Sequence, residues 1–70
     1  MDEIEIQDGS IRLGQFLKLA SLIDTGADAK MVISDGLVSV NGEVETRRGA
    51  QLTAGDVVEI GGISVRVGAP

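Results

Sequence analysis

The stretch Gly36-Leu37-Val38-Ser39-Val40-Asn41-Gly42 marks the point where the hydrophobic pattern of this chain changes from a helical period to a period of two. Gly36 is a suitable helix terminator, because glycine adopts a positive φ without steric cost. Val38 and Val40 share one face of a strand, and Asn41-Gly42 favours the tight type I′ turn of a hairpin. We therefore expect a helix before this stretch and a β-hairpin built around it.

Two short helices are predicted on the N-terminal side of the stretch. The first runs roughly from Gly14 to Leu22, and its apolar side chains recur at helical spacing: Leu13, Phe16, Leu17 and Ala20. The second begins after Thr25, whose hydroxyl is placed to cap the helix at Asp28, three residues later. Its predicted buried stripe consists of Ala29, Val32, Ile33 and Gly36.

The N-terminal segment is predicted as an acidic edge strand within residues 1–8. Ile4 and Ile6 alternate there with polar residues, and Asp8-Gly9 breaks the alternation. Four of the eleven acidic residues of the chain lie in this segment, which contains no basic residue. Much of the negative charge is therefore expected at this strand.

Strand periodicity continues after the hairpin turn. The far strand of the hairpin is expected to return through Val44 and Thr46, and two further strands are predicted on either side of a tight turn at Gly61-Gly62. Residues 68–70 are expected to form a frayed tail. The predicted fold class is α+β, with two short helices in a helical hairpin packed on a small, mostly antiparallel sheet, in a single domain of residues 1–70.

The residue types that are missing exclude most catalytic chemistry. The chain has no Cys and no His, which removes the commonest zinc ligands, the usual general base and the most nucleophilic side chain. Neither a nucleophile–base pair nor a glycine-rich phosphate loop is recognisable. We expect a protein that is not an enzyme and binds no metal or cofactor. The acidic N-terminus and the lack of a long apolar run predict a cytoplasmic monomer that does not enter membranes.

The overall charge argues against a polyanionic ligand, but the distribution of charge weakens that argument. The chain has 11 acidic and 6 basic residues, for a formal net charge of -5. Between Gly9 and Gly49, however, acids and bases are equal in number, and the bases are Arg12, Lys18, Lys30, Arg47 and Arg48. The sequence is compatible with nucleic-acid binding if folding brings these bases to one face.

An ordered set of residues resembles the small RNA-binding domain first described in the fourth ribosomal small-subunit protein, which contains the αL motif. The matching residues are Leu13, Leu17, Thr25, Ala29, Lys30, Ile33, Gly36, Val38, Val40-Asn41-Gly42 and Gly55-Asp56. The resemblance covers about residues 11–60, and residues 14–19 and 43–49 look especially like the stand-alone bacterial members. It implies an RNA-binding αL fold, with structured RNA, including ribosomal RNA, as the expected partner.

The family's RNA face implies a set of candidate contacts in this chain. That face is formed by the first helix, the start of the second helix and the hairpin, and with the charge pattern it gives Arg12, Lys18, Thr25, Lys30, Asn41, Gly42, Arg47 and Arg48. Lys30, Arg47 and Arg48 are the first choices for phosphate contacts. Many members carry Ser-Arg where this chain has Thr25-Gly26, so Gly26 supplies no guanidinium. Because the single aromatic, Phe16, is expected in the core, binding should depend on phosphates rather than base stacking.

Two alternative interpretations are open, and a third is disfavoured. Arg47 would be an ordinary surface residue if it paired with Glu45 or Glu43. The whole domain would be a protein-interaction adaptor with the same fold if its acidic charge and Gly26 left little RNA affinity. The segments 40–43 and 55–60 also occur in ubiquitin-like sulfur carriers, but such carriers need a C-terminal Gly-Gly carboxylate, whereas this chain ends in Gly68-Ala69-Pro70.

Overall fold

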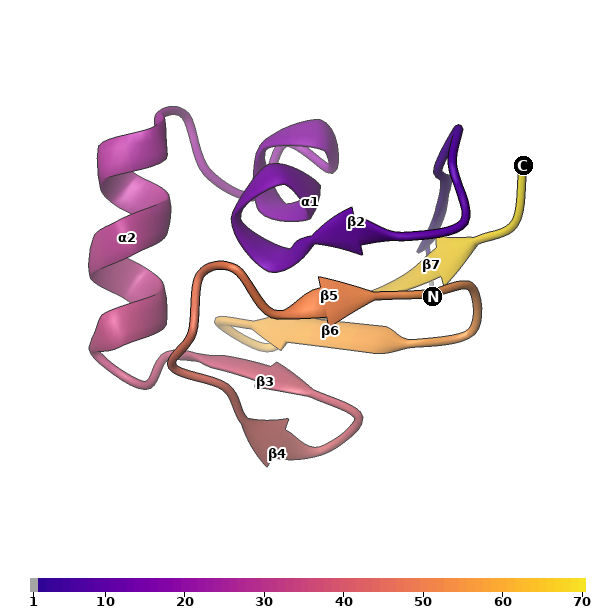
Figure 1. Ribbon diagram of the computed structural model, residues 1–70. Coiled ribbons are helices and arrows are strands. Elements are labelled where there is room, and N and C mark those ends of the chain that lie inside the picture. Colours follow the sequence, from indigo (N-terminus) through magenta and orange to yellow (C-terminus); the bar gives the residue numbers. More distant parts are fainter. Residues whose placement is uncertain (1) are drawn as a thin grey trace.

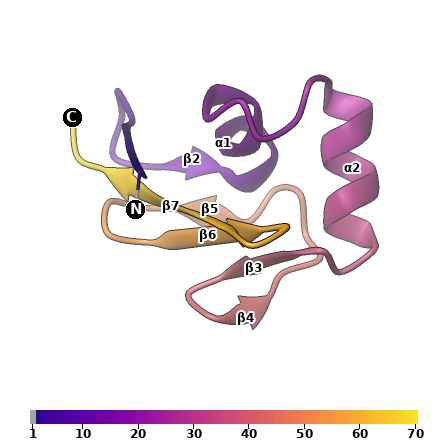
Figure 2. The same cartoon turned by 180° about the vertical axis from the view of Figure 1, so that it is seen from behind.

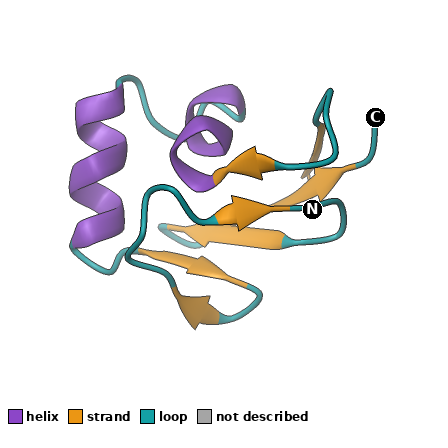
Figure 3. Ribbon diagram, in the orientation of Figure 1, coloured by secondary structure: helices purple, strands orange, loops and turns teal. Residues whose placement is uncertain are grey.

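A five-stranded sheet with two helices on one side forms the frame of residues 2–70, the part of the chain that the computed structural model describes (Figure 1). The elements in chain order are β1 (Asp2–Glu5), β2 (Ile11–Arg12), α1 (Leu13–Leu19), α2 (Gly26–Ser34), β3 (Val38–Val40), β4 (Glu43–Val44), β5 (Gln51–Leu52), β6 (Val57–Ile60) and β7 (Ile63–Gly68). Strands in the main sheet follow the order β1-β7-β6-β3-β4, while β2 pairs only with β5 in a two-stranded ladder. The predicted α+β class is confirmed (Figure 3).

The main sheet is antiparallel except at its first strand. β1 pairs in parallel with β7, so that Ile4 lies opposite Val67, and Figure 2 shows this segment beside β7 from behind. The predicted tight turn between β3 and β4 is confirmed, because Asn41 and Gly42 have φ of 53° and 86°. Gly61 and Gly62 likewise have positive φ in the turn between β6 and β7.

Helix α1 ends at Leu19, three residues before the predicted end. Ser21 adopts a φ of 58°, which takes the backbone out of the helix. The N–H of Leu22 then donates to the carbonyl of Leu17 at 2.9 Å, and the N–H of Ser21 donates to Lys18 at 3.1 Å. This is a Schellman ending, and the sequence did not reveal it because serine occupies the left-handed position that usually holds glycine.

Helix α2 begins and ends where the sequence predicts. Thr25 Oγ1 accepts a hydrogen bond from the backbone N–H of Asp28 at 3.1 Å, which satisfies one of the unpaired donors of the first turn. At the other end Gly36 has a φ of 76°, and the N–H of Leu37 donates to the carbonyl of Val32 at 3.1 Å.

The hydrophobic core lies between the helices and the inner face of the sheet. Its buried side chains come from both helices, from β3, β5, β6 and β7, and from the residue after β1: Ile6, Leu13, Phe16, Leu17, Ala29, Ile33, Val38, Leu52, Val58, Val65 and Val67. Phe16 is fully buried, as predicted. Complete burial of a large apolar side chain contributes roughly 1.5–3 kcal/mol, so these residues fix the two helices on the sheet.

Three features differ from the prediction. The short pair β2 and β5 was not anticipated, and β4 ends at Val44, so Thr46 is not part of a strand. Gly68 belongs to β7 rather than to a frayed tail, because it lies opposite Glu5 and its carbonyl accepts the N–H of Ile6 at 3.1 Å. Met1, included in the predicted N-terminal strand, lies outside the described residues. Neither helix of residues 2–70 has the length and apolar character needed to cross a membrane.

Candidate nucleic-acid interface

A groove lies where the start of α1, the start of α2 and the segment between β4 and β5 meet. Its volume is about 320 Å³, and it is lined by Arg12, Gly14, Gln15, Lys18, Gly26, Ala29, Arg48 and Gly49. We call it the basic groove, because three of these side chains are cationic and none of the described residues that line it is acidic. Arg12 is the N-cap residue of α1 and Lys18 lies in its last turn, whereas Arg48 comes from the segment between β4 and β5 and joins them only in the folded chain.

The segment after β4 is fastened to the first turn of α1 by the backbone. The N–H of Leu13 donates to the carbonyl of Ala50 at 2.8 Å, and the N–H of Gly14 donates to the carbonyl of Arg48 at 3.0 Å. Arg12, the N-cap residue, makes no side-chain cap hydrogen bond. The two carbonyls therefore satisfy N–H groups that a helix start leaves without intrahelical partners.

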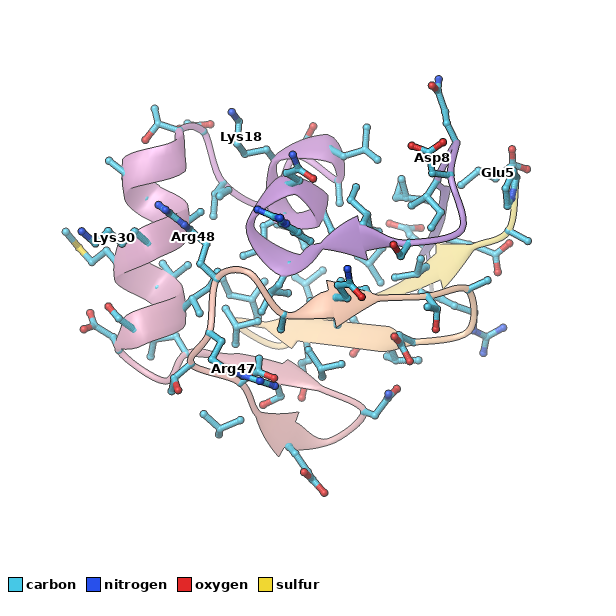
Figure 4. The ribbon with its side chains drawn as sticks, in the orientation of Figure 1. Glu5, Asp8, Lys18, Lys30, Arg47 and Arg48 are labelled. Carbon is cyan, nitrogen blue, oxygen red and sulfur yellow. The ribbon has the colours of Figure 1, made fainter. Side chains whose placement is uncertain are left out.

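Gly14 also sets the path of the Arg48 side chain. A Cβ placed on Gly14 would lie 2.7 Å from Arg48 Cγ and 3.3 Å from its Cδ, and the first of these distances is shorter than van der Waals contact permits. Only glycine leaves room for Arg48 to run across the start of α1. In Figure 4 the guanidinium of Arg48 extends from the loop toward the space between α1 and α2.

The cations of the basic groove are free of carboxylate partners. Within residues 2–70 the one ion pair joins Arg47 to Glu45, so Arg12, Lys18 and Arg48 keep their charge uncompensated at contact distance. The acidic N-terminal segment does not reach these cations: Figure 4 shows Glu5 and Asp8 at one end of the molecule, and Lys18 and Arg48 nearer the other. This separation leaves a locally positive surface on a protein of net negative charge.

Arg47 is held outside the basic groove by Glu45. Arg47 Nε donates to Glu45 Oε2 at 3.1 Å, and Nη2 donates to Oε1 at 3.1 Å, a bidentate arrangement. These hydrogen bonds hold the pKa of Glu45 below its ordinary value and raise the pKa of Arg47. The alternative interpretation that pairs Arg47 with Glu45 is therefore confirmed, and the two neighbouring arginines point to different places (Figure 4).

Lys30 is also separate from the basic groove. It is exposed on α2 and projects from the outer side of that helix in Figure 4, and it is absent from the residues that line the groove. The structure thus brings together Arg12, Lys18 and Arg48 from the predicted contacts, but it does not bring Lys30 or Arg47 to them.

The polar residues among the predicted contacts have structural partners. The Thr25 hydroxyl caps α2. The Asn41 side chain donates to Asp56 Oδ1 at 3.0 Å and accepts the N–H of Val57 at 2.9 Å. Asn41 and Gly42 form the hairpin turn, which lies at the end of the sheet away from α2 (Figures 1 and 2).

Five lining residues are not among the predicted contacts: Gly14, Gln15, Gly26, Ala29 and Gly49. Most are small and contribute space and backbone rather than charge. The signal for Gly14 is its position inside a predicted helix. Glycine there costs up to about 1 kcal/mol of stability relative to alanine, so its presence indicates a close approach by another segment. Gly26 stands where the resemblance to the family implies an arginine, whereas the lining roles of Gln15, Ala29 and Gly49 depend on how distant segments pack together.

A family model described as the S4 domain matches residues 4–68. The chain belongs to the S4 domain family. The match extends beyond residues 11–60, the range of the sequence resemblance, and includes the second half of β1 and all of β7. The predicted family is confirmed.

Relatives within this family have similar lengths. The chain is 52% identical over 59 residues to the probable ribosome maturation protein RlbA of Bacillus subtilis, covering 84% of this chain and 83% of the relative. It is 42% identical over 57 residues to the putative RNA-binding protein YbcJ of Escherichia coli, covering 81% of each chain.

Two solved structures show a similar fold. The solution structure of Escherichia coli YbcJ, described as revealing an αL motif involved in RNA binding, matches with a TM-score of 0.76 and 37% identity, covering 99% of this chain and 89% of YbcJ. The 30S ribosomal protein S4e of Thermoplasma acidophilum matches with a TM-score of 0.65 and 30% identity, covering 86% of this chain and 32% of that protein.

Proposed function

We propose that this S4 domain binds structured RNA, and that Arg12, Lys18 and Arg48 contact its phosphates in the basic groove. The observation that carries this proposal is the meeting of these three cations around one groove with no acidic lining residue. Phosphate contacts supply most of the affinity of sequence-tolerant nucleic-acid binding. The local positive charge of the groove therefore allows RNA to bind although the chain as a whole is negatively charged.

The chemistry of the groove suits a ribose–phosphate backbone. The guanidinium of Arg48 presents a planar fork that matches two phosphate oxygens, and the Lys18 ammonium acts as a point charge. Gly26 and Ala29 line the α2 side of the groove with little or no side chain, so that the RNA backbone can approach this side closely. The positive end of the α2 dipole adds to the attraction.

The absence of aromatic side chains from the groove defines the mode of recognition. Phe16 is the only aromatic in the chain and is fully buried in the core. Bases therefore have no stacking platform, and the domain reads phosphate positions and RNA shape with modest sequence preference.

The relatives support RNA as the ligand. One relative is named a putative RNA-binding protein and another a probable ribosome maturation protein. We propose ribosomal RNA, or RNA within a ribosome-related assembly, as the ligand class.

The direct test is to cross-link RNA to the protein in cells and sequence what is recovered. The wild type should recover structured RNA, and a variant carrying Arg12→Ala, Lys18→Ala and Arg48→Ala should recover far less at equal protein level. A charge-matched variant carrying Lys30→Ala, Arg47→Ala and Arg66→Ala removes three cations outside the groove and should recover nearly as much as the wild type. Equal recovery by the wild type and the groove variant would refute the proposal.

A further inference from the structure

A second groove lies on the other flank of α1. Its volume is about 410 Å³, and it is lined by Glu5, Ile6, Gln7, Asp8, Ser10, Ile11, Gln15 and Leu19. Gln15 lines both this groove and the basic groove. The two grooves are therefore neighbours across α1, one cationic and one acidic.

The second groove combines apolar surface with negative charge. Leu19, at the last position of α1, leaves 51% of its surface exposed, and Ile11, which lines the same groove, is only partly buried. Glu5 and Asp8 supply the charge, and none of the described lining residues is basic. Neither carboxylate takes part in an ion pair within residues 2–70.

We propose that this acidic groove docks a basic segment of a partner protein, with an apolar side chain of that segment seated against Leu19 and Ile11. Charge complementarity selects the partner, since Glu5 and Asp8 attract Lys and Arg side chains and repel RNA phosphates. The volume lies within the range of roughly 300–1,000 Å³ found for small-ligand sites. It therefore admits side chains of a peptide segment rather than the surface of a folded domain.

The position of the groove explains why a basic partner would be found there. If RNA occupies the basic groove, as proposed above, then a chain in the acidic groove lies on the other side of Gln15 from that RNA. Polypeptides that share a complex with RNA carry Lys and Arg to neutralise its phosphates. A segment of this kind is attracted by the carboxylates of this domain and by the RNA beside it.

The test is a titration followed by amide chemical shifts, without RNA, using two synthetic peptides of equal length. One alternates Lys with Leu and the other alternates Glu with Leu. The basic peptide should bind and move the amide signals of Ile6, Ser10 and Leu19, whereas the acidic peptide should not bind. Glu5→Gln with Asp8→Asn should weaken binding of the basic peptide by about five- to tenfold, the loss expected for two exposed charges.

Two controls separate this site from general charge effects and from the RNA site. Glu59→Gln removes an exposed carboxylate of β6, outside the groove, and should leave peptide binding unchanged. Arg48→Ala should also leave it unchanged, so that failure of RNA binding and failure of peptide binding are separate outcomes. The proposal is overturned if both peptides bind alike, if Glu59→Gln weakens binding as much as the double variant does, or if an RNA hairpin moves the acidic-groove signals instead.

Discussion

Gly14 contacts Arg48 in two ways: its backbone N–H donates a hydrogen bond to the Arg48 carbonyl, and its lack of a Cβ leaves room for the Arg48 side chain. The N–H of Gly14 donates to the Arg48 carbonyl at 3.0 Å, and Arg48 Cγ occupies the space that a Cβ on residue 14 would need. The first contact fixes the loop on the start of α1, and the second leaves room for the arginine to pass that start. Together they place a cation from the segment between β4 and β5 beside Arg12 and Lys18, which lie much earlier in the sequence.

Gly14→Ala should weaken RNA binding without unfolding the protein. The new Cβ would lie 2.7 Å from Arg48 Cγ, so the arginine must change rotamer and leave the groove. Alanine also gains up to about 1 kcal/mol of helix propensity over glycine, which offsets part of the strain. We expect a loss of affinity close to that of Arg48→Ala, with little change in Tm, measured by fluorescence anisotropy on a labelled RNA hairpin and by thermal denaturation.

A double-mutant cycle identifies the cause of this effect. Once Arg48 has been replaced by alanine, Gly14→Ala has no Cγ to displace, so it should cause no further loss. Additive losses in the double variant would show that Gly14 acts on RNA binding by some other route.

Gly26→Arg should strengthen RNA binding. Gly26 lines the basic groove, a Cβ there would meet nothing within 4 Å, and its φ is not among the positive values, so an arginine fits without strain. It would supply the cation that the resemblance to the family implies at this position. We expect tighter binding and a log–log salt slope steeper by about 1. Ala27→Arg, one position along the helix, is the matched control, and equal gains from both would contradict a specific role for the groove.

The Glu45–Arg47 ion pair predicts a pH dependence of stability. Arg47 lowers the pKa of Glu45 below its ordinary value of 4.5, so the ionised carboxylate favours the folded state. Its contribution is fully present above pH 4.5 and is lost as the pH falls through the lower folded pKa. Thermal denaturation should show the wild type above Glu45→Gln in Tm near neutrality, with the difference vanishing in acid. A difference that persists unchanged in acid would rule out this origin.

Asn41→Ala should reduce stability and leave RNA binding unchanged. The Asn41 side chain makes two hydrogen bonds, to Asp56 and Val57, and its φ of 53° is one that alanine adopts less readily. Loss of these features should cost about 2 kcal/mol, measured by urea denaturation. A loss of RNA affinity in folded Asn41→Ala would instead show that the hairpin turn contacts RNA.

The parts of the fold that were predictable from the sequence are those with local chemical causes. The cap at Thr25, the terminator at Gly36 and the turn at Asn41-Gly42 each depend on a few neighbouring residues, and all three are confirmed. The ladder between β2 and β5 joins two-residue strands far apart in the sequence, so no periodicity marks it. The end of α1 was missed because Ser21 has no intrinsic preference for a positive φ.

The candidate site was less predictable than the fold. The cationic residues were identified, but which of them meet depends on tertiary packing. Arg47 and Arg48 are adjacent and alike, yet one is held by Glu45 and the other enters the groove. Lys30 is exposed, as its position off the predicted buried stripe of the second helix indicates. Its side chain, however, projects away from the basic groove. Helical spacing shows which side is buried, not which exposed side faces the other cations.

The most direct test of the central claim is to compare Arg48→Ala with Arg47→Ala in RNA affinity and salt dependence. Both variants remove one arginine and change the net charge equally, so long-range electrostatics cannot distinguish them. If the basic groove binds RNA, Arg48→Ala should weaken binding to a structured RNA hairpin by about tenfold or more and reduce a wild-type log–log slope of roughly 2 to 4 by about 1. Arg47→Ala should have a much smaller effect on both. Equal losses in the two variants, or a larger loss in Arg47→Ala, would contradict the account.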